Sequence, residues 1–126
     1  MRFLSIYHAA ETGTPPTPEE MAAMGALIQE MTSAGTLITT EGCLPSALGA
    51  RVRRSGDALS VTDGPFTESK ELVAGFALLE AESKEHAIEL TRRFLQVAGD
   101  GECEIRALYQ GDGCVPELAL ADTASA

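Results

Sequence analysis

The chain has few of the residue types that build metal and cofactor sites. It contains no tryptophan, two histidines and three cysteines among 126 residues. Cys43, Cys103 and Cys114 show no CxxC spacing and no neighbouring histidine pair, so the sequence predicts neither a disulfide framework nor a zinc site. It also lacks HxH and HExxH spacings, a glycine-rich phosphate loop and a nucleophile elbow. We therefore expect no metal and no cofactor.

Basic residues and long apolar runs are also scarce. Nine basic residues against 19 acidic ones give a formal net charge of −10, which repels nucleic acids and anionic membranes. The apolar run near Met1 is about six residues long, shorter than the apolar part of a signal peptide and far shorter than a membrane span. Unpaired cysteines suit a reducing compartment. The sequence thus predicts a cytoplasmic protein without nucleic-acid or membrane partners.

The chain does have the length and composition of one globular domain. Hydrophobic residues make up 44% of it and aromatic residues 5%, which predicts a core of small aliphatic side chains and methionine. We place this domain at residues 1–109. Residues 110–126 are rich in glycine, alanine and acidic residues with weak periodicity, and there we expect a mobile tail.

Two helices carry clear start and stop signals. Thr17 supplies an N-cap hydroxyl before Pro18, and Glu20 is placed to close a capping box. The first helix should therefore run from residue 18 to residue 34 and end at a left-handed Gly35. The second should follow Ser83, run over residues 84–98 and stop at the next glycine.

Strands alternate with these helices. Alternating or β-branched runs predict strands at residues 2–7, 36–40, 72–80 and 103–109, and a three-residue turn predicts a side hairpin of 50–54 with 58–62. The order β-α-β-(hairpin)-β-α-β is that of a ferredoxin-like α+β domain with an antiparallel sheet and both helices on one face. Because Val73 to Leu79 is apolar on both faces, we expect a homodimer packed sheet to sheet.

The segment VTDGPFTESKE at residues 61–71 is the strongest candidate for a site. Gly64 can adopt a positive φ and Pro65 restricts its own φ, so a stiff turn presents the Asp63 carboxylate in one direction. The charged side chains of Glu68, Lys70 and Glu71 follow Asp63 within the same segment. Directed carboxylates are what acid–base chemistry requires.

Three segments together resemble a known family. Residues 34–45 (AGTLITTEGCLP), residues 61–71 and the pair Gly75-Phe76 are similar to the YCII-related family and, within it, to the DGPF group. The resemblance spans residues 2–108 and implies a dimeric α+β barrel, with a cleft in each subunit at the sheet surface between the protomers. Some YCII members are regarded as small-molecule enzymes using a His–Asp pair, and DGPF domains often occur beside extracytoplasmic-function sigma factors.

Two departures from the family pattern bear on ligand choice. Thr39 and Thr40 stand where the family usually has Gly-Gly, which narrows the space beside Glu41. Ala77 stands where an aromatic residue often follows Gly-Phe, which enlarges a pocket or thins a packing contact. The ligand of this chain can therefore differ from those of its relatives.

The candidate catalytic residues are Asp63, Glu41 and His8. Asp63 can act as a general acid or base if burial raises its pKa, or it can simply accept local backbone amides in an Asx-turn. Glu41 lies at a strand end before a glycine, where its side chain can enter a cleft or serve at a rim. His8 ends the first strand, from which it can reach a central cleft.

The candidate substrate-binding residues are Lys70, Glu68, Tyr7 and Phe66. Lys70 near Glu68 could hold an anionic substrate or form an exposed salt bridge of little worth. Tyr7 could present its hydroxyl to the cleft or be a partly buried strand tyrosine with a satisfied hydroxyl. Phe66, which belongs to the DGPF turn, is the fourth candidate for substrate binding.

Three functions fit these observations. The first is a cofactor-free small-molecule enzyme of the isomerase, lyase or hydrolase type, with acid–base carboxylates in a cleft of the dimeric barrel. The second is a noncatalytic ligand-binding or regulatory module, in line with the sigma-factor association that the resemblance implies. In the third, the segment from Asp63 to Glu71 only sets strand register and dimerisation.

Overall fold

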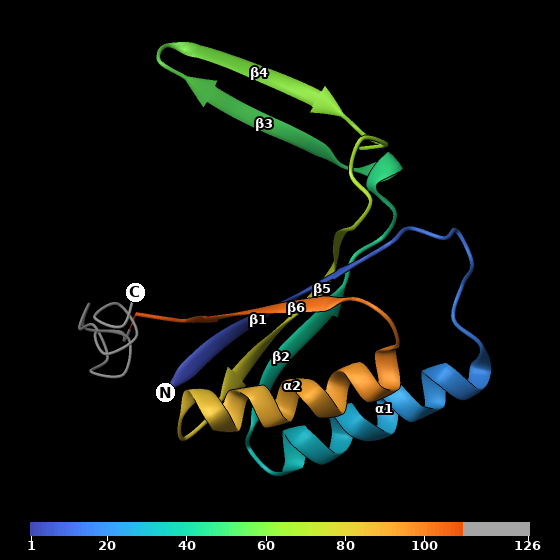
Figure 1. The fold of residues 1–126 in the computed structure, drawn as a ribbon, viewed down its shortest axis with the longest axis vertical. Helices are drawn as coiled ribbons and strands as arrows, with labels where there is room; N and C mark the ends of the chain where they lie inside the picture. The colour runs from blue at the N-terminus through green and yellow to red at the C-terminus, as the bar shows by residue number, and fades with distance from the viewer. Residues whose placement is uncertain (110–126) are drawn as a thin grey trace.

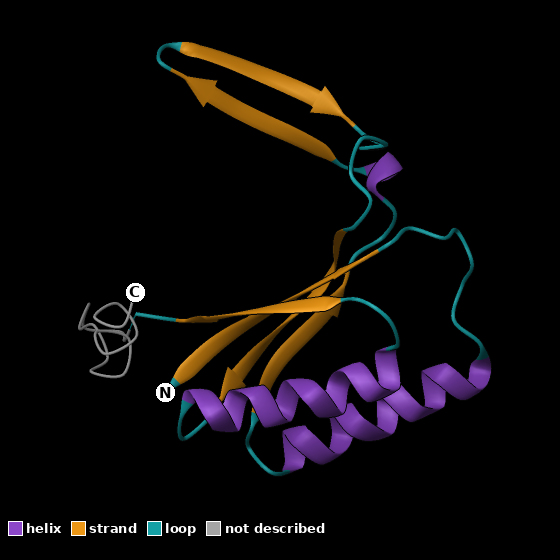
Figure 2. Ribbon diagram, in the orientation of Figure 1, coloured by secondary structure: helices purple, strands orange, loops and turns teal. Residues whose placement is uncertain are grey.

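The computed structural model describes residues 1–109, and the expected tail at 110–126 lies outside the described residues. A four-stranded antiparallel sheet in the order β2-β5-β1-β6 carries both helices on one face (Figures 1 and 2). The α+β class and the ferredoxin-like order predicted from the sequence are confirmed. The elements of this layered body are β1 (Arg2–Ala9), α1 (Pro18–Ser33), β2 (Leu37–Gly42), β5 (Leu72–Glu80), α2 (Lys84–Ala98) and β6 (Glu102–Ala107).

The helix ends follow the capping signals. The Thr17 side chain accepts a hydrogen bond from the backbone N–H of Glu20 at 3.1 Å, and Gly35 follows α1 with a φ of 79°. Ser83 likewise accepts from the backbone N–H of His86, and Gly99 ends α2. Side-chain caps of this kind satisfy amides that have no partner within the helix. Local sequence therefore determines where both helices begin and end.

The strand ends differ from the prediction because partner strands set them. β1 continues through Ala9, since its last two residues pair with Val73 and Leu72 of the long strand β5. β2 and β6 are each shifted relative to the predicted ranges. The hairpin of β3 (Ala50–Ser55) and β4 (Ala58–Asp63) has a two-residue turn instead of the predicted three, because Ser55 pairs with Ala58. Ladder hydrogen bonds of this kind cannot be read from one strand alone.

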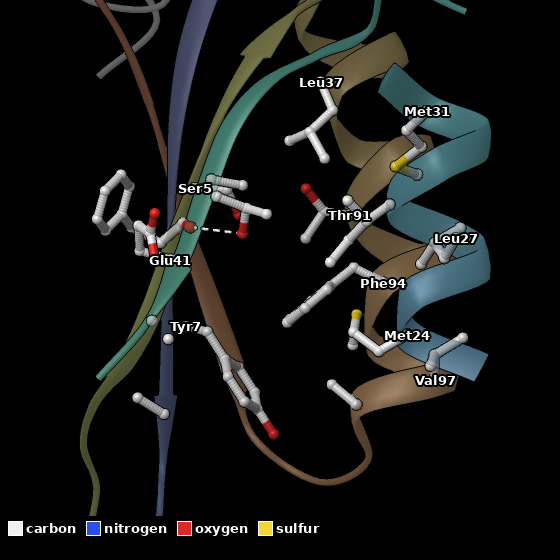
Figure 3. Close-up of a pocket in the computed structure, with 18 of the residues that line it drawn as sticks. Ser5, Tyr7, Met24, Leu27, Met31, Leu37, Glu41, Thr91, Phe94 and Val97 are labelled. Carbon is white, nitrogen blue, oxygen red and sulfur yellow. Dashed lines mark hydrogen bonds between the residues drawn. The ribbon is translucent and has the colours of Figure 1, made fainter. Parts of the chain in front are cut away.

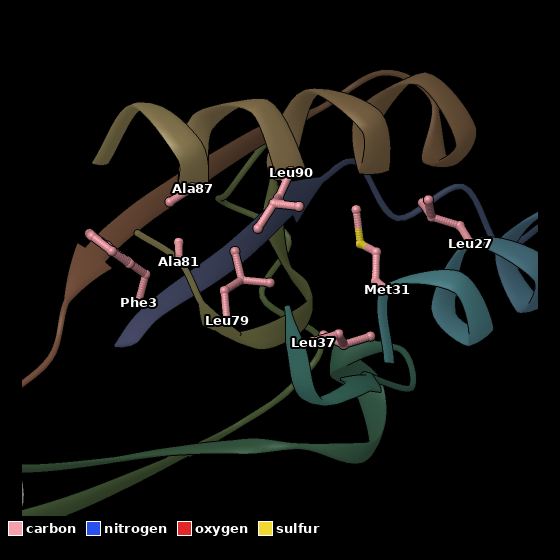
Figure 4. Close-up of a cluster of buried hydrophobic side chains, with 8 residues drawn as sticks. All are labelled: Phe3, Leu27, Met31, Leu37, Leu79, Ala81, Ala87 and Leu90. Atoms are coloured by element: carbon pink, nitrogen blue, oxygen red, sulfur yellow. The ribbon is translucent and has the colours of Figure 1, made fainter. Parts of the chain in front are cut away.

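A compact core fills one end of the space between the sheet and the helices. Phe3, Leu79 and Leu37 come from three neighbouring strands and all face the helices. Figure 4 shows the whole cluster. Its buried members are Phe3, Leu27, Met31, Leu37, Leu79, Ala81, Ala87 and Leu90. Because side chains alternate across a strand, Leu4, Ile6 and His8 of β1 point to the opposite face. No helix of the described part of the chain covers that face (Figure 2).

The β3–β4 hairpin forms a separate two-stranded sheet that extends away from the layered body (Figure 1). Every residue of both strands is exposed. One face of the hairpin carries Val52, Leu59 and Val61, exposed by 71%, 72% and 65%. An uncovered two-stranded hairpin is marginally stable in water. Within residues 1–109, both this apolar face and the open face of the main sheet therefore lack cover.

Candidate functional site

A cavity lies between the sheet and the two helices, beside the core. It has a volume of about 540 Å³ and is lined by residues of β1, β2, β5 and both helices (Figure 3). Small residues on the helix-facing side of the strands leave this space open, namely Ser5, Gly42, Gly75 and Ala77. The helices contribute the larger apolar side chains Met21, Met24, Ile28, Phe94 and Val97. Ala77, singled out in the sequence as a pocket-enlarging residue, is thus part of the cavity wall.

Tyr7 supplies a polar group to this cavity. Its ring lies on the helix side of the sheet (Figure 3) and meets Phe94 edge to face, with 5.2 Å between the ring centroids. The hydroxyl donates a hydrogen bond to the backbone oxygen of Asp100 at 2.8 Å. Burial raises the pKa of this hydroxyl, and Cys103, Asp100 and Glu71 raise it further. Tyr7 is therefore a neutral, fixed hydroxyl group at physiological pH.

The DGPF turn is bound to the short 3-10 helix η1 (Ser46–Leu48). The backbone N–H of Gly64 donates to the oxygen of Gly49 at 2.9 Å, and that of Phe66 donates to Ser46 Oγ at 3.2 Å. The expectation of a positive φ at Gly64 is wrong, since its φ is not positive. Its need for glycine is instead steric, because a Cβ there would lie 1.7 Å from the backbone oxygen of Ser46.

Ser46 also joins the turn to the loop before α1. The Glu11 carboxylate accepts hydrogen bonds from the Ser46 backbone N–H at 2.6 Å and from its hydroxyl at 2.8 Å. A second cavity of about 210 Å³ lies at this junction and includes Arg51 and Phe66 in its lining. Glu11 and Ser46 were not predicted from the sequence, because neither belongs to a motif and their partners are far away in the chain.

Two of the predicted substrate contacts are already engaged by Arg51. Its guanidinium lies 3.8 Å from the centroid of the Phe66 ring and 2.6 Å from Glu68 Oε1. A hydrogen bond from its own backbone lowers the pKa of the exposed Glu68 carboxyl, and Arg51 lowers it further. An exposed pair of this kind contributes little to stability. These contacts hold the segment after the DGPF turn against the hairpin.

Comparison with known proteins agrees with this architecture. Residues 1–110 match the YCII-related domain. The chain belongs to the YCII-related family. It is also 31% identical over 93 residues to an uncharacterized protein of Rhizobium meliloti (strain 1021), a match that covers 71% of this chain and 75% of the relative. The family assignment made from the sequence is therefore confirmed.

In this YCII-related protein, the three candidate catalytic residues do not meet in the larger cavity. Asp63 is exposed at the end of β4, opposite Ala50 in the hairpin. The Glu41 side chain lies on the side of the sheet away from the helices (Figure 3), in line with its pairing to Phe76. His8 follows Tyr7 in β1 and so faces the same open side as Glu41. The catalytic roles of these residues stay predictions.

Lys70, the remaining candidate, is exposed and precedes β5. It lines neither of the two cavities described above. Within residues 1–109, no three His, Cys, Asp or Glu side chains come together as a metal-binding group. Over the same residues, no helix combines the length and apolar character needed to cross a membrane.

Proposed function

We propose that this YCII-related protein binds a small, largely apolar molecule in the cavity between its sheet and its helices. The observation that carries the proposal is the cavity of about 540 Å³ with mainly apolar walls. Its size falls in the range of about 300–1,000 Å³ that is usual for small-molecule sites. A few fixed polar groups in apolar walls are also typical of such sites, and Tyr7 is a group of that kind.

The walls combine rigid and adaptable parts. Strands β1, β2 and β5 form a hydrogen-bonded backbone surface in which small side chains leave room. The opposite wall contains Met21, Met24 and Met31 of α1. Methionine side chains are flexible and polarizable, so they can adjust to apolar ligands of different shape. This arrangement supports binding of a ligand whose shape the helices accommodate.

Filling the cavity should remove binding. Ala77 faces the helices between Ser5 and Thr40, so the ring introduced by Ala77→Phe would occupy the space beside them. We expect this variant to bind naphthalene at least about tenfold more weakly than the unmodified protein, because ligand and side chain compete for one volume. Titration followed by ¹H–¹⁵N NMR measures the affinity and locates the site through the shifted amides.

The matched control is Ala23→Phe, the same change at an exposed position of α1 that does not line the cavity. It should bind naphthalene as the unmodified protein does. Ala77→Leu, a smaller filling change, covers the case in which the phenyl ring disturbs folding. Undiminished binding in a folded Ala77→Phe protein, or shifts confined to another surface, would exclude this cavity as the site.

A second proposal concerns the open face of the sheet, where we infer that a second copy of the chain packs. The apolar side chains Leu4, Ile6, Phe76 and Leu78 share this face, and Phe76 is 37% exposed. The exposed apolar face of the hairpin would find cover in the same assembly. Glu41 and His8 lie on the open face as well, which favours this interface as the place for the predicted acid–base chemistry of an isomerase, lyase or hydrolase.

The state of assembly tests this second proposal. Sedimentation equilibrium at micromolar concentration should give twice the mass of one chain. Ile6→Glu should give a monomer, because it places a carboxylate without a partner in the centre of an apolar interface. Met21→Glu, on the helix side and 62% exposed, should remain dimeric. A monomeric unmodified protein, or a dimeric Ile6→Glu variant, would contradict the arrangement.

A further inference from the structure

The polar side chains of the larger cavity all carry oxygen atoms as their polar groups. They are four hydroxyls, from Ser5, Tyr7, Thr40 and Thr91, and the carboxylate of Glu20. Glu41 also borders the cavity, but its side chain lies on the opposite side of the sheet (Figure 3). Among the lining residues that the structure describes, none carries a side-chain nitrogen. The hydroxyls are therefore the only side-chain groups there with a proton to donate at neutral pH.

Three of these hydroxyls already donate their protons to acceptors within the protein. Thr40 donates to the backbone oxygen of Phe76 at 2.8 Å (Figure 3, dashed), and Thr91 donates to the backbone oxygen of Ala87 at 2.8 Å. Tyr7 donates to the backbone oxygen of Asp100 at the same distance. Each hydroxyl oxygen keeps lone pairs, so it can still accept a hydrogen bond.

Ser5 forms a hydrogen bond with the thiol of Cys103. Burial raises the pKa of this thiol, while the hydrogen bond with the Ser5 side chain lowers it. Three of the four hydroxyls thus have internal acceptors for their protons and the fourth is engaged with a thiol, so the cavity offers a ligand mainly acceptors.

We propose that the cavity selects an uncharged apolar ligand bearing one hydroxyl or N–H donor, which Tyr7 Oη accepts, and that it discriminates against carboxylates and against ligands with only acceptor groups. This proposal rests on the proposed function of the same cavity. A carboxylate would lose its hydration and find no cation in the wall, in a chain of net charge −10. An ether or ketone oxygen would lose its hydrogen bonds to water and face further acceptors.

Tyr7 is the best placed of the four acceptors. Its ring is held by the edge contact with Phe94, and the backbone at Gly101 approaches it so closely that a Cβ there would lie 2.5 Å from Tyr7 Cε1. The bond to Asp100 orients the hydroxyl hydrogen away from a ligand that approaches the oxygen. A fixed acceptor needs little reorganisation on binding, which favours affinity.

Four compounds with one ring system test the selectivity: 2-naphthol, 2-methoxynaphthalene, naphthalene and 2-naphthoate. We expect 2-naphthol to bind about tenfold more tightly than 2-methoxynaphthalene, as one hydrogen bond made or lost in a desolvated site implies. Binding of 2-naphthoate should be the weakest of the four. NMR titration at pH 7 measures all of the affinities, with naphthalene as the reference for the apolar contribution.

Tyr7→Phe should bring the affinities for 2-naphthol and 2-methoxynaphthalene within about twofold of one another. Naphthalene binding, measured in the same variant, gives the change in the apolar contribution against which both affinities are compared. Tyr109→Phe, at a residue 77% exposed and outside the cavity lining, should keep the full preference. Thr91→Val provides a second, independent removal of an acceptor and should reduce the preference less. If Tyr7→Phe keeps the full preference, Tyr7 is not the acceptor and the proposal is overturned.

The remaining outcomes separate the two claims about this cavity. Binding of naphthalene at the cavity together with equal or tighter binding of 2-methoxynaphthalene overturns the donor selectivity but leaves the proposed function standing. Tight binding of 2-naphthoate in the cavity likewise overturns the donor selectivity and leaves the proposed function standing. Failure of all four compounds to bind overturns the proposed function, and the selectivity with it.

Discussion

Gly64→Ala should lower the free energy of unfolding by about 3 kcal/mol, at the upper end of what overpacking costs. A Cβ at this position would lie 1.7 Å from the backbone oxygen of Ser46 and 2.6 Å from its carbonyl carbon. Both atoms belong to the backbone, so no side-chain rotation relieves the contact. The turn would have to leave η1 and lose the hydrogen bonds of Gly64 to Gly49 and of Phe66 to Ser46. Urea denaturation followed by circular dichroism measures the change.

Gly49→Ala is the matched control for this variant. It makes the same chemical change in the same junction, at a φ of −115° that alanine accepts, and the nearest atom to its Cβ is again the Ser46 oxygen, at 3.6 Å. We expect no loss of stability, since removing a glycine restricts the unfolded chain. Equal stability of the two variants would show that the turn does not depend on close packing against η1.

Gly101→Ala should lower the free energy of unfolding by about 2–3 kcal/mol and also displace Tyr7. Its Cβ would lie 2.5 Å from Tyr7 Cε1 and 2.6 Å from the backbone oxygen of His8, at a φ of 151°. Relief requires the loop before β6 to move away from β1. Because the same loop carries the Asp100 oxygen that orients the Tyr7 hydroxyl, we expect binding of 2-naphthol to weaken as well.

Gly99→Ala separates the steric effect from backbone strain. Gly99 has a φ of 97°, yet nothing lies within 4 Å of a Cβ at that position. This control should lose about 1–2 kcal/mol through strain alone and should keep the position of Tyr7. The Tyr7 ring resonances in NMR spectra report that position directly. If they shift equally in both variants, close contact at Gly101 is not what positions the ring.

The contacts of the DGPF segment bear on its role. Its glycine packs against η1, its phenylalanine lies beneath Arg51, and Glu68 forms an ion pair with the same arginine. Asp63 remains exposed at the end of the hairpin. The contacts described here attach the hairpin to the body of the domain. They support the structural interpretation of the segment, while a catalytic role of Asp63 stays a prediction.

The sequence was sufficient for the features that depend on local interactions. Thr17 and Ser83 cap the helices with their own side chains, and the bounds of α2 and β5 agree with the predicted ranges. The order of strands and helices, together with the chirality and packing rules for such chains, then leaves few topologies. The family assignment likewise rested on short segments that can be compared one residue at a time.

Only the tertiary structure decided which residues form a site. Ser5 has no signal in the sequence, and Ala77 and Gly75 stand out there only through the family pattern, which does not say what they face. Strand pairing places the three residues side by side facing the helices, and their small size leaves the cavity. The same pairing turns Glu41 to the opposite face, where sequence alone gave it no defined side. Hydroxyl orientation and the contact between Gly64 and Ser46 also depend on partners far away in the chain. Capping and periodicity act over a few residues, whereas a cavity is defined by the absence of atoms between elements that meet only in the folded protein.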